Sequence, residues 1–573
     1  RGTKRIFTKQ KGWTKEMKFN DQKEVEIKST KKKEEKSEEK KSFISKKTDI
    51  LNQERRFFMK ERPIIENQII EIIDRLKGLC HTCGLSNQAA EEEIVTSVFL
   101  YKYLSDNYKI CAFKKASHTG KSIAEIFTSG IQTDVELKAE DLIDCMVRIM
   151  DNPHIADIFD NTLVRIASYP NNKKFGKSLG EPLFKPITKT IEKRNEFVRE
   201  ILKLMDGHDI FSDETDYFAP IFEYLIKDYN VASGRYAEYY TPGEISDIIA
   251  KILTRGEERT DCQIYDPSAG SGSLLLHLAH ELDSRCSVYS QDISAKSTRL
   301  LRINMILNGY TNSIQNIKQG DTLLNPYYMG KKYDYIVSNP PFKTDFSFTR
   351  NEIEERWSTC SRFIDGVPEI PKKKKEAMPI YLCFIQHVLW ALNDAGKAAV
   401  VVPAGFLSIK DGIEEKIRRR IVNNGWLSGV IIMPRNTFAN TATKVAVLFI
   451  DKSKWHQQAV LMDASGLGTL TKIGKNKRII LSEDDAASIV EGFFDKESSS
   501  TVITPLSEIA LNGYSFIPGQ YMKMKNYQNL LSEEEFRDKT LRFEEDYKIL
   551  CQKEKESDST IFSILAQVRS NIC

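Results

Sequence analysis

The sequence lacks any long apolar run, and this absence narrows the class of protein. None of its 573 residues falls in an apolar stretch near the ~18 residues that a membrane-spanning helix needs. The first residues do not follow the basic, apolar and small pattern of a secretory signal. The ten cysteines lack the spacing of a disulfide framework. These absences exclude a membrane protein and a disulfide-rich secreted domain, and they predict a cytoplasmic protein.

Excess positive charge is confined to one end of the chain. Residues 1–60 carry 20 Lys and Arg against 10 Asp and Glu, a net charge of +10 within a total of +4, so the rest sums to −6. Because this stretch has little to bury, we expect a charged extension that is disordered or mobile, with a nucleic-acid-binding arm as the alternative. The remaining chain is not basic overall, so any contact with nucleic acid must be local or shared with a partner.

The hydrophobic pattern changes near residue 260. Residues 61–230 carry helical spacing, as in "IIENQIIEIIDRLKGLC", and predict a helical domain. Afterwards β-branched runs alternate with helical segments, for example the helix "KSTRLLRINMILNG" that ends at Gly309. The expected strands are 262–266, 287–292, 314–319, 333–338, 397–403, 428–434 and 444–451. This alternation predicts an α/β domain over 231–525 with a doubly wound, mostly parallel Rossmann-like sheet, whose last strand is antiparallel because no helix fits before it. Residues 526–573 predict a C-terminal helical tail.

A glycine loop follows the first expected strand, in "YDPSAGSGSLLLHLAH". Gly270 and Gly272 permit a tight turn where a strand feeds a helix, and Asp292 ends the second strand, where an acid can accept hydrogen bonds from ribose hydroxyls. The three-glycine spacing that seats a pyrophosphate is missing. Asp266 at the mouth of the loop is expected to repel phosphates and to attract a cationic amino-acid group. S-adenosyl-L-methionine, a nucleoside with an ammonium and a sulfonium, fits these charges.

The fourth expected strand ends in an unusual way, in "YDYIVSNPPF". Prolines cannot donate to a strand ladder, so Asn339, Pro340, Pro341 and Phe342 are expected to end the strand at the same crevice. The Asn339 amide oxygen and the Pro340 carbonyl can accept hydrogen bonds from one exocyclic amine, while Phe342 offers a face for a flat base. Positioning and polarity then suffice to let the amine attack a methyl group. A target base in a duplex would have to be flipped out.

Six motifs in this order resemble those of the modification subunits of type I restriction–modification systems, an N6-adenine DNA methyltransferase family. They are "GRYAEYYTPGEISDIIAKIL", "DPSAGSG", "SQDIS", "QGDTLL", "SNPPF" and "MPRNTFANTATKVAVLFIDK". The resemblance covers about residues 62–525. It implies a helical domain followed by a class I S-adenosylmethionine-dependent methyltransferase domain, acting as a site-specific, adenine-specific DNA methyltransferase.

The resemblance also assigns the site residues. Those that would bind the cofactor are Glu238, Tyr239, Tyr240, Thr241, Pro242, Gly243, Asp266, Gly270, Ser271, Gly272, Ser273, Asp292 and Asp321. Those that would hold the target adenine are Asn339, Pro340, Pro341 and Phe342. The sequence departs from the family at Asp292, where Glu is frequent, and in residues 1–60, for which the family has no evident counterpart.

A module that reads DNA sequence is missing, since such a module takes ~50 residues or more. The irregular stretch from Lys343 to the next expected helix at 377 is long enough only for a lid or a DNA-contacting loop. Lys372–Lys375 within it form either a solvated turn or a phosphate contact. The resemblance implies a separate specificity subunit bound to double-stranded DNA with a flipped adenine, with a second copy of the chain and a restriction or translocase subunit as further candidates.

The C-terminal tail is our candidate for gripping the specificity subunit. Phe536, Phe543, Tyr547 and Leu550 form a narrow apolar stripe amid charge. The stripe indicates either a helix docked on its own domain or half of a coiled-coil-like joint with another chain.

Weaker signals suggest other chemistry. One Cys80-x-x-Cys83 pair without a second pair is a poor zinc site. Asp134, Glu136 and Lys138 have nuclease-like spacing in a region whose pattern predicts a helix, where such a string is usually a solvated face. Alternative functions are methylation of an RNA base or of a glutamine amide, and a DNA-binding scaffold without turnover.

Overall fold

The structure, a computed structural model, describes residues 70–83, 88–178, 180–185, 190–206, 241–256, 260–282, 286–438, 444–473, 476–494, 500–522 and 533–570. The chain divides into two compact units, residues 1–518 and 519–573. The charged extension 1–60 and the predicted site residues Glu238, Tyr239 and Tyr240 lie outside the described residues. Among the helices of the described ranges, none combines the length and apolar character required to cross a membrane.

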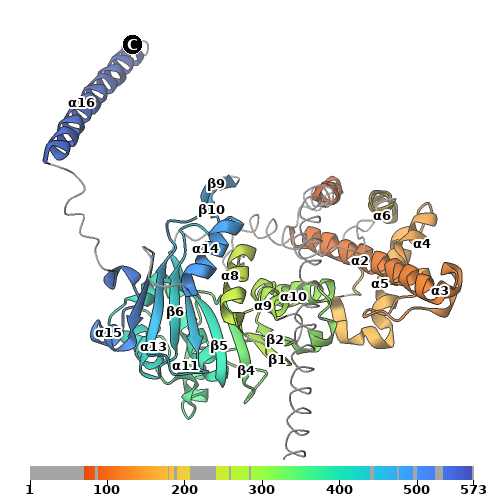
Figure 1. Cartoon of the computed structure of the whole chain (residues 1–573). Coiled ribbons are helices and arrows are strands. Elements are labelled where there is room, and N and C mark those ends of the chain that lie inside the picture. The colour runs from red at the N-terminus through yellow and green to blue at the C-terminus, as the bar shows by residue number, and fades with distance from the viewer. Residues whose placement is uncertain are drawn as a thin grey trace, which may run out of the picture. The chain divides into compact units, whose positions relative to one another are not determined.

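A nine-stranded sheet forms the centre of the first unit, in the order β11-β8-β6-β7-β5-β4-β1-β2-β3 (Figure 1). The strands, together with the separate hairpin β9–β10, are β1 Cys262–Asp266, β2 Cys286–Asp292, β3 Ile317–Gln319, β4 Tyr333–Ser338, β5 Leu392–Pro403, β6 Leu427–Ile432, β7 Val445–Asp451, β8 Gln458–Asp463, β9 Thr469–Ile473, β10 Asn476–Ile480 and β11 Thr501–Pro505. Strand β1 pairs in parallel with β2 and β4, and β7 runs antiparallel to β5 and β6. The predicted mostly parallel sheet with a reversed strand is confirmed.

Several strand predictions need correction. Strand β3 has only three residues, because Thr311–Asn316 form a 3-10 helix. Strand β5 begins at Leu392, five residues before the expected start at 397. We did not predict β8 to β11, because they follow short polar segments and β9 is rich in Thr and Lys, which gives no clear apolar alternation.

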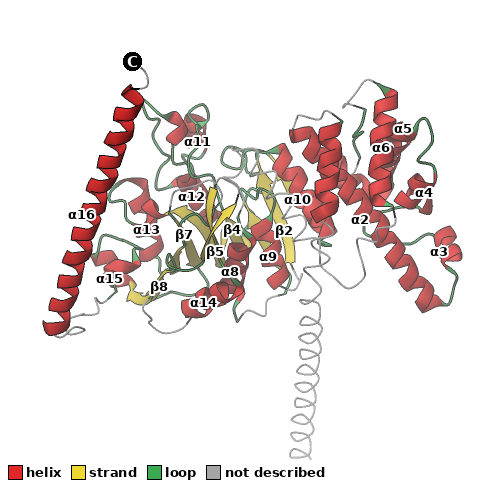
Figure 2. Cartoon of the chain, turned by 90° about the horizontal axis from the view of Figure 1, so that it is seen from above, coloured by secondary structure: helices red, strands yellow, loops and turns green. Residues whose placement is uncertain are grey.

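Helices cover both faces of the sheet. Figure 2 shows α8 (Gly243–Thr254), α9 (Ser273–Glu281) and α14 (Glu483–Phe494) on one side, and α12 (Tyr381–Ala391) and α13 (Gly412–Asn423) on the other. The central strands are therefore rich in apolar residues, and every residue of β7 is buried. The remaining helices of this domain are α10 Ala295–Leu307, α11 Arg350–Arg356 and α15 Leu506–Leu511.

The region before the sheet is helical, as predicted. It contains α2 Gln88–Thr119, α3 Ile123–Ser129, α4 Ile143–Arg148, α5 Ile155–Ser168 and α6 Ile191–Met205. Edge-to-face aromatic contacts build its core, with ring centroids 5.3 Å apart for Tyr101 and Phe159. Helix α2 meets α10 of the sheet domain, where an Arg299 guanidinium N–H donates to the Ser97 hydroxyl at 2.7 Å. The helical region and the sheet thus belong to one unit.

The second unit contains one long helix, α16, from Glu533 to Ser570. The sequence predicted a helix from about residue 526, seven residues earlier. The side chains of the predicted apolar stripe are exposed, with exposed fractions of 64% for Phe536, 73% for Phe543, 63% for Tyr547 and 64% for Leu550.

The stretch after Phe342 is more regular than expected. It contains α11 and two short 3-10 helices, Ser361–Phe363 and Lys375–Ala377. The next longer helix, α12, begins at Tyr381 rather than at 377.

Candidate active site

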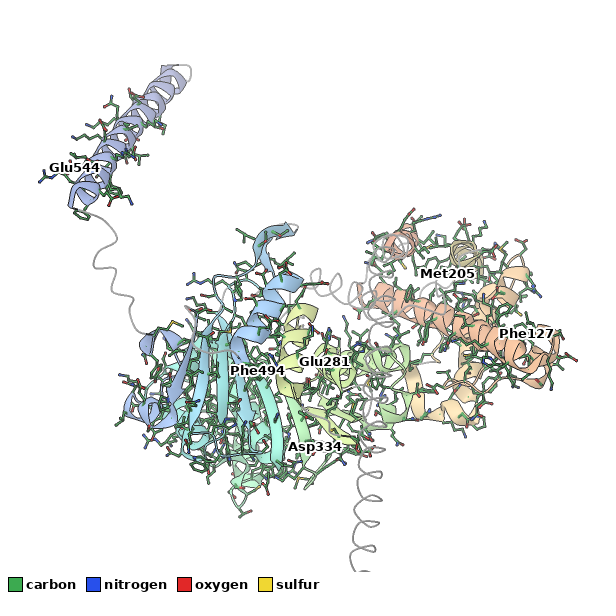
Figure 3. All side chains as sticks on the ribbon, in the orientation of Figure 1. Phe127, Met205, Glu281, Asp334, Phe494 and Glu544 are labelled. Carbon is green, nitrogen blue, oxygen red and sulfur yellow. The ribbon has the colours of Figure 1, made fainter. Side chains whose placement is uncertain are left out.

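The carboxyl ends of β1, β2 and β4 meet at one edge of the sheet. Because β1 pairs in parallel with both neighbours, Asp266, Asp292 and Ser338 end their strands side by side. Successive strands proceed from β1 to β3 on one side, and β4 returns on the other, so this is the topological switch point where open α/β sheets bind ligands. Asp334, labelled in Figure 3, stands near the opposite, amino end of β4.

The glycine loop between β1 and α9 requires its glycines. Gly272 adopts a φ of 90° at the N-cap of α9, and a Cβ there would lie 2.1 Å from Leu301 Cδ1. Gly270 has a φ of 55°, and its N–H donates to Asp292 Oδ2 at 2.9 Å. The Asn304 amide donates to the Ser271 carbonyl at 3.2 Å and fixes the middle of the loop. The loop is therefore held in one conformation by groups from β2 and α10.

Asp266 lies at the floor of the loop. Its side chain is 1% exposed, and Oδ1 accepts the Ser268 N–H at 2.8 Å. Burial, with a smaller contribution from Asp292, raises the pKa of Asp266 from 3.8 to about 8. Asp266 is therefore buried in the floor of the loop rather than exposed at its mouth, and this burial disfavours the charged form of its carboxyl.

The two other acidic residues of the predicted site that the structure describes, Asp292 and Asp321, stabilise turns. Asp292 accepts the Gly270 N–H and, at 2.8 Å through Oδ1, the Ser294 N–H. Burial raises the pKa of Asp292. Asp321 Oδ1 accepts the Leu323 and Leu324 N–H groups at 2.8 and 3.1 Å. A carboxylate has about four lone-pair positions, so these bonds leave acceptor capacity for a ligand.

Asn339 lies at the end of β4 with its amide orientation fixed. Its side-chain nitrogen donates to the Thr241 hydroxyl oxygen at 3.0 Å, and the exposed fractions are 5% and 4%. Because the amide nitrogen is hydrogen-bonded to Thr241, the amide oxygen can accept a hydrogen bond from a ligand. Pro340 is buried, and the half-buried Phe342 ring meets Tyr381 at 6.3 Å and 74°. The segment therefore offers rigid acceptors beside an aromatic ring.

A small cavity lies between the glycine loop and Asn339. Its empty volume is about 220 Å³. The lining consists of Thr241, Asp266, Ser268, Ala269, Ser271, Ser273, Leu274 and Asn339. Five of these are predicted site residues, and Gly270 and Gly272 flank Ser271 in the same loop. Asp292, Asp321 and Phe342 lie outside this lining.

Serine hydroxyls connect the site's elements, and three of these four serines, Ser246, Ser268 and Ser338, were not predicted. Ser268 and Ser338 hydroxyl oxygens are 2.8 Å apart and join the glycine loop to β4. The hydroxyls of Ser246 on α8 and Ser273 on α9 are 3.0 Å apart. Pro242 and Gly243 begin α8, so this contact brings the start of that helix to the glycine loop. Ser268 and Ser338 fall inside two of the six motifs, but serine alone is not a specific signal.

The buried Arg362 holds the turn that contains Asp321 in place, and no pattern in the sequence indicated this role. Arg362 donates to the Thr322 and Leu323 carbonyls at 2.6 and 2.9 Å and to His387 Nδ1 at 3.0 Å. The Thr322 hydroxyl donates in turn to the Pro267 carbonyl at 2.8 Å. Burial lowers the pKa of Arg362 to about 10 and that of His387 well below 6.5. The Asp321 turn is thus tied to both β1 and the segment after Phe342.

The weaker signals do not form sites. Burial raises the pKa of the Cys80 thiol to about 12, and within the described ranges no three His, Cys, Asp or Glu side chains gather as a metal site requires. Asp134, Glu136 and Lys138 lie in a loop rather than in the expected helix, and a Glu136 oxygen accepts the Asn171 N–H at 3.3 Å. The prediction of a helix failed there because the string carries no apolar periodicity.

The sheet order, the reversed β7 and the site at the switch point define a methyltransferase of the class I fold. The chain matches the N-6 DNA Methylase family over residues 213–529 and belongs to that family. It is 26% identical over 510 residues to the type I restriction enzyme MpnII methylase subunit of Mycoplasma pneumoniae, covering 81% of this chain and 90% of that protein. It is 23% identical over 558 residues to the MjaVII methylase subunit of Methanocaldococcus jannaschii, covering 93% and 90%.

Solved structures share the fold. The type I restriction–modification methyltransferase subunit from Streptococcus thermophilus superposes with a TM-score of 0.65 at 20% identity, covering 80% of this chain and 99% of that one. A modification subunit of a type I restriction enzyme from Vibrio vulnificus gives a TM-score of 0.54 at 16% identity, covering 78% and 93%. The predicted resemblance to type I modification subunits is therefore confirmed.

Proposed function

We propose that the chain transfers a methyl group from S-adenosyl-L-methionine to the N6 amine of adenine in DNA. It acts as the modification subunit of a type I restriction–modification complex whose sequence specificity comes from a separate subunit. The observation that carries the proposal is the Asn339–Thr241 hydrogen bond, which fixes a buried amide in the lining of the cavity beside the glycine loop. Family membership supports the substrate class, and the subunit names of the curated relatives support the partner.

The donor set fits the cofactor. The glycine loop brings backbone close to a ligand, and Ser271 and Ser273 line the same cavity. Asp292 and Asp321 keep acceptor capacity for ribose and adenine groups, and Asp266 lies at the floor, where a cationic group would favour its ionised form. Pro242 and Gly243, at the start of α8, follow the segment that would close the site. The cofactor, when bound, supplies an electrophilic methyl group.

The Asn-Pro-Pro-Phe segment would position the target adenine. Asn339 Oδ1 and the Pro340 carbonyl accept the two N–H bonds of the exocyclic amine, and Phe342 stacks on the base. Hydrogen bonds from both N–H groups to these acceptors increase the electron density on the nitrogen and leave its lone pair free for the methyl group. The proton that the nitrogen loses on methylation would leave along one of these hydrogen bonds to solvent. Positioning and electrostatic stabilisation supply the catalysis, so no strong base is required.

The protein partner would bind through α16. The exposed stripe of Phe536, Phe543, Tyr547 and Leu550 is one seam of a coiled coil, and a helical segment of the specificity subunit fits it. The relatives are named as subunits of type I restriction enzymes, which supports a restriction subunit as a further member of the assembly. A second copy of the chain is proposed from the family resemblance alone.

The test compares the wild type with Asn339→Ala and with the control Asn512→Ala, whose side chain is exposed on another part of the sheet domain. N6-methyladenine is mapped by single-molecule sequencing in cells that express the chain with its genomic neighbours. A sequence-specific mark is expected in the wild type and the control and is lost in Asn339→Ala, while calorimetric cofactor affinity stays within about threefold. Loss of cofactor binding in a folded Asn339→Ala protein would contradict the division of roles. A cofactor-binding wild type with its partner but without a mark would indicate an RNA or protein substrate, or a scaffold.

A further inference from the structure

The segment that follows the Asn-Pro-Pro-Phe motif is a small rigid body with its own core. Phe346, Ile353, Trp357 and Phe363 are all less than 9% exposed and pack together with residues that begin α12. The Arg350 guanidinium donates to the Val367 and Pro368 carbonyls at 3.1 Å each. Figure 2 shows α11 and its loops standing off the sheet beyond α12. The segment therefore holds a fixed shape next to the candidate site.

Phe348 projects from this body into solvent. Its exposed fraction is 94%, the highest of any large hydrophobic side chain in the described part of the chain, whereas Phe346 two residues earlier is 6% exposed. The turn between them is held by Asp345 Oδ1, which accepts the Ser347 N–H at 3.0 Å, and by the Phe346 carbonyl, which accepts the Arg350 N–H at 2.9 Å. The exposure is thus a property of an ordered turn, and burying this ring on a partner would cost little conformational entropy.

A run of lysines lies on the segment next to this turn. The Thr344 N–H donates to the Met378 carbonyl at 3.1 Å, which places the turn beside the run Lys372–Lys375. Hydrogen bonds from Ser347 lower the pKa of Asp345, and the charge of Lys375 lowers it further, so the two segments are electrostatic neighbours. Lys343 and the four lysines of the run are exposed, as are the acids Asp345, Glu369 and Glu376 and the three glutamates of α11, Glu352, Glu354 and Glu355. The positive charge of this segment is therefore concentrated in the run Lys372–Lys375.

The chemistry of this surface fits duplex DNA. The phosphate backbone carries one negative charge per ~1.7 Å of axis and favours lysines, while an apolar ring between them can enter the base stack. Phe348 follows Phe342 by six residues, so it lies within about 20 Å of chain from the candidate base pocket. One duplex can therefore meet both. A protein partner would also cover an exposed ring, but the run of four lysines next to the turn favours a polyanion.

We propose that Lys343, Phe348 and Lys372–Lys375 form the surface that grips duplex DNA, with Phe348 filling the gap that the flipped adenine leaves in the base stack. This inference rests on the proposed function and adds to it the residue that stabilises the extrahelical base. Phe348 replaces the stacking that the departing base gives up, and the lysines hold the phosphates on either side.

The experiment uses the complex with its specificity partner and a duplex that carries the mapped target site. A second duplex places an abasic site opposite the target adenine, so that the pairing cost of flipping is already removed. Variants are Phe348→Ala, Phe348→Trp, which keeps an aromatic face, and Leu511→Ala, an equally exposed control at 88%. Flipping costs a few kcal/mol, so Phe348→Ala is expected to lower kcat/KM on the paired duplex roughly 10- to 100-fold. On the abasic duplex it should stay within about threefold of wild type, and Phe348→Trp should resemble wild type on both.

A second measurement tests the lysines. Lys374→Glu should flatten the dependence of log Kd on log salt concentration by about one unit for every phosphate that the lysine neutralises in the wild type. If Phe348→Ala has wild-type kinetics on the paired duplex, the role of Phe348 is wrong. If Lys374→Glu leaves the salt dependence of Kd unchanged, the role of the lysines is wrong. Equal loss on both duplexes together with a weakened subunit complex would show that Phe348 contacts protein. If the cofactor-bound wild type methylates neither duplex, the proposed function itself is wrong and this inference falls with it.

Discussion

Replacing Thr241 by valine isolates the hydrogen bond on which the proposed mechanism depends. Valine has nearly the same shape as threonine but cannot accept the Asn339 amide N–H, whose present distance to the Thr241 oxygen is 3.0 Å. Both residues are about 95% buried, so the amide nitrogen loses its partner without gaining water. Leaving a buried donor unsatisfied costs about 1–3 kcal/mol. The amide can reduce this cost only by turning, which takes its oxygen away from the target amine.

The cost therefore appears in methyl transfer. Because each 1.36 kcal/mol is a factor of ten in rate, the single-turnover rate should fall roughly 5- to 150-fold in Thr241→Val. Thr241→Ser keeps the hydroxyl and should stay within about threefold of wild type. The assay follows transfer of a labelled methyl group to a target duplex in the partner complex, with cofactor affinity measured separately. Equal rates for the valine and serine variants would refute the orienting role. Weaker cofactor binding at an unchanged rate would assign Thr241 to the cofactor alone, as the family resemblance implied.

Two further predictions concern the glycine loop. Gly272→Ala should weaken cofactor binding and, in denaturant unfolding, should destabilise the protein by about 1–2 kcal/mol more than Gly309→Ala. Both glycines have a positive φ, but only a Cβ at position 272 would meet Leu301, at 2.1 Å. Equal destabilisation by the two variants would contradict the clash. As pH rises from 6 to 8, the free energy of unfolding of Asp266→Asn should increase by about 2–3 kcal/mol relative to that of the wild type. The folded-state pKa of about 8 lies above 3.8, so wild-type stability falls as pH rises between these values, whereas asparagine does not titrate. Parallel pH profiles of the two proteins would refute the buried, protonated carboxyl.

The sequence was most informative where local pattern and chemistry coincide. The bounds of β1 and β4 were predicted to the residue, because each is a short buried apolar run that ends in a polar motif. Their adjacency followed from the usual order of doubly wound sheets. The depth of Asp266 was not predictable, since a loop sequence does not show which of its residues faces the core. Strands β8 and β11 were missed because each is short and follows a polar segment, although β8 lies between β11 and β6 in the sheet.

Contacts between distant residues were the main omission. Arg362 holds the Thr322 carbonyl from 40 positions away, and neither residue belongs to a pattern that predicts the other. Thr241 and Asn339 are 98 positions apart, and the sequence placed them in separate roles, one for the cofactor and one for the base. Such contacts depend on the tertiary fold. The number of residues between two motifs does not show how far apart they lie in space.

Under the proposed function, the Thr241–Asn339 pair predicts that cofactor binding and base binding are energetically coupled. Thr241 closely precedes α8, and α8 is joined to the glycine loop by the Ser246–Ser273 contact at 3.0 Å. A ligand that fixes the start of α8 therefore also fixes the Thr241 oxygen, which accepts the Asn339 amide N–H, and with it the direction of the Asn339 amide oxygen. Coupling of this kind is reciprocal, so the cofactor should tighten binding of an extrahelical adenine by the same factor by which the base tightens binding of the cofactor. In Thr241→Val, where the connecting hydrogen bond is gone, the two ligands should bind independently.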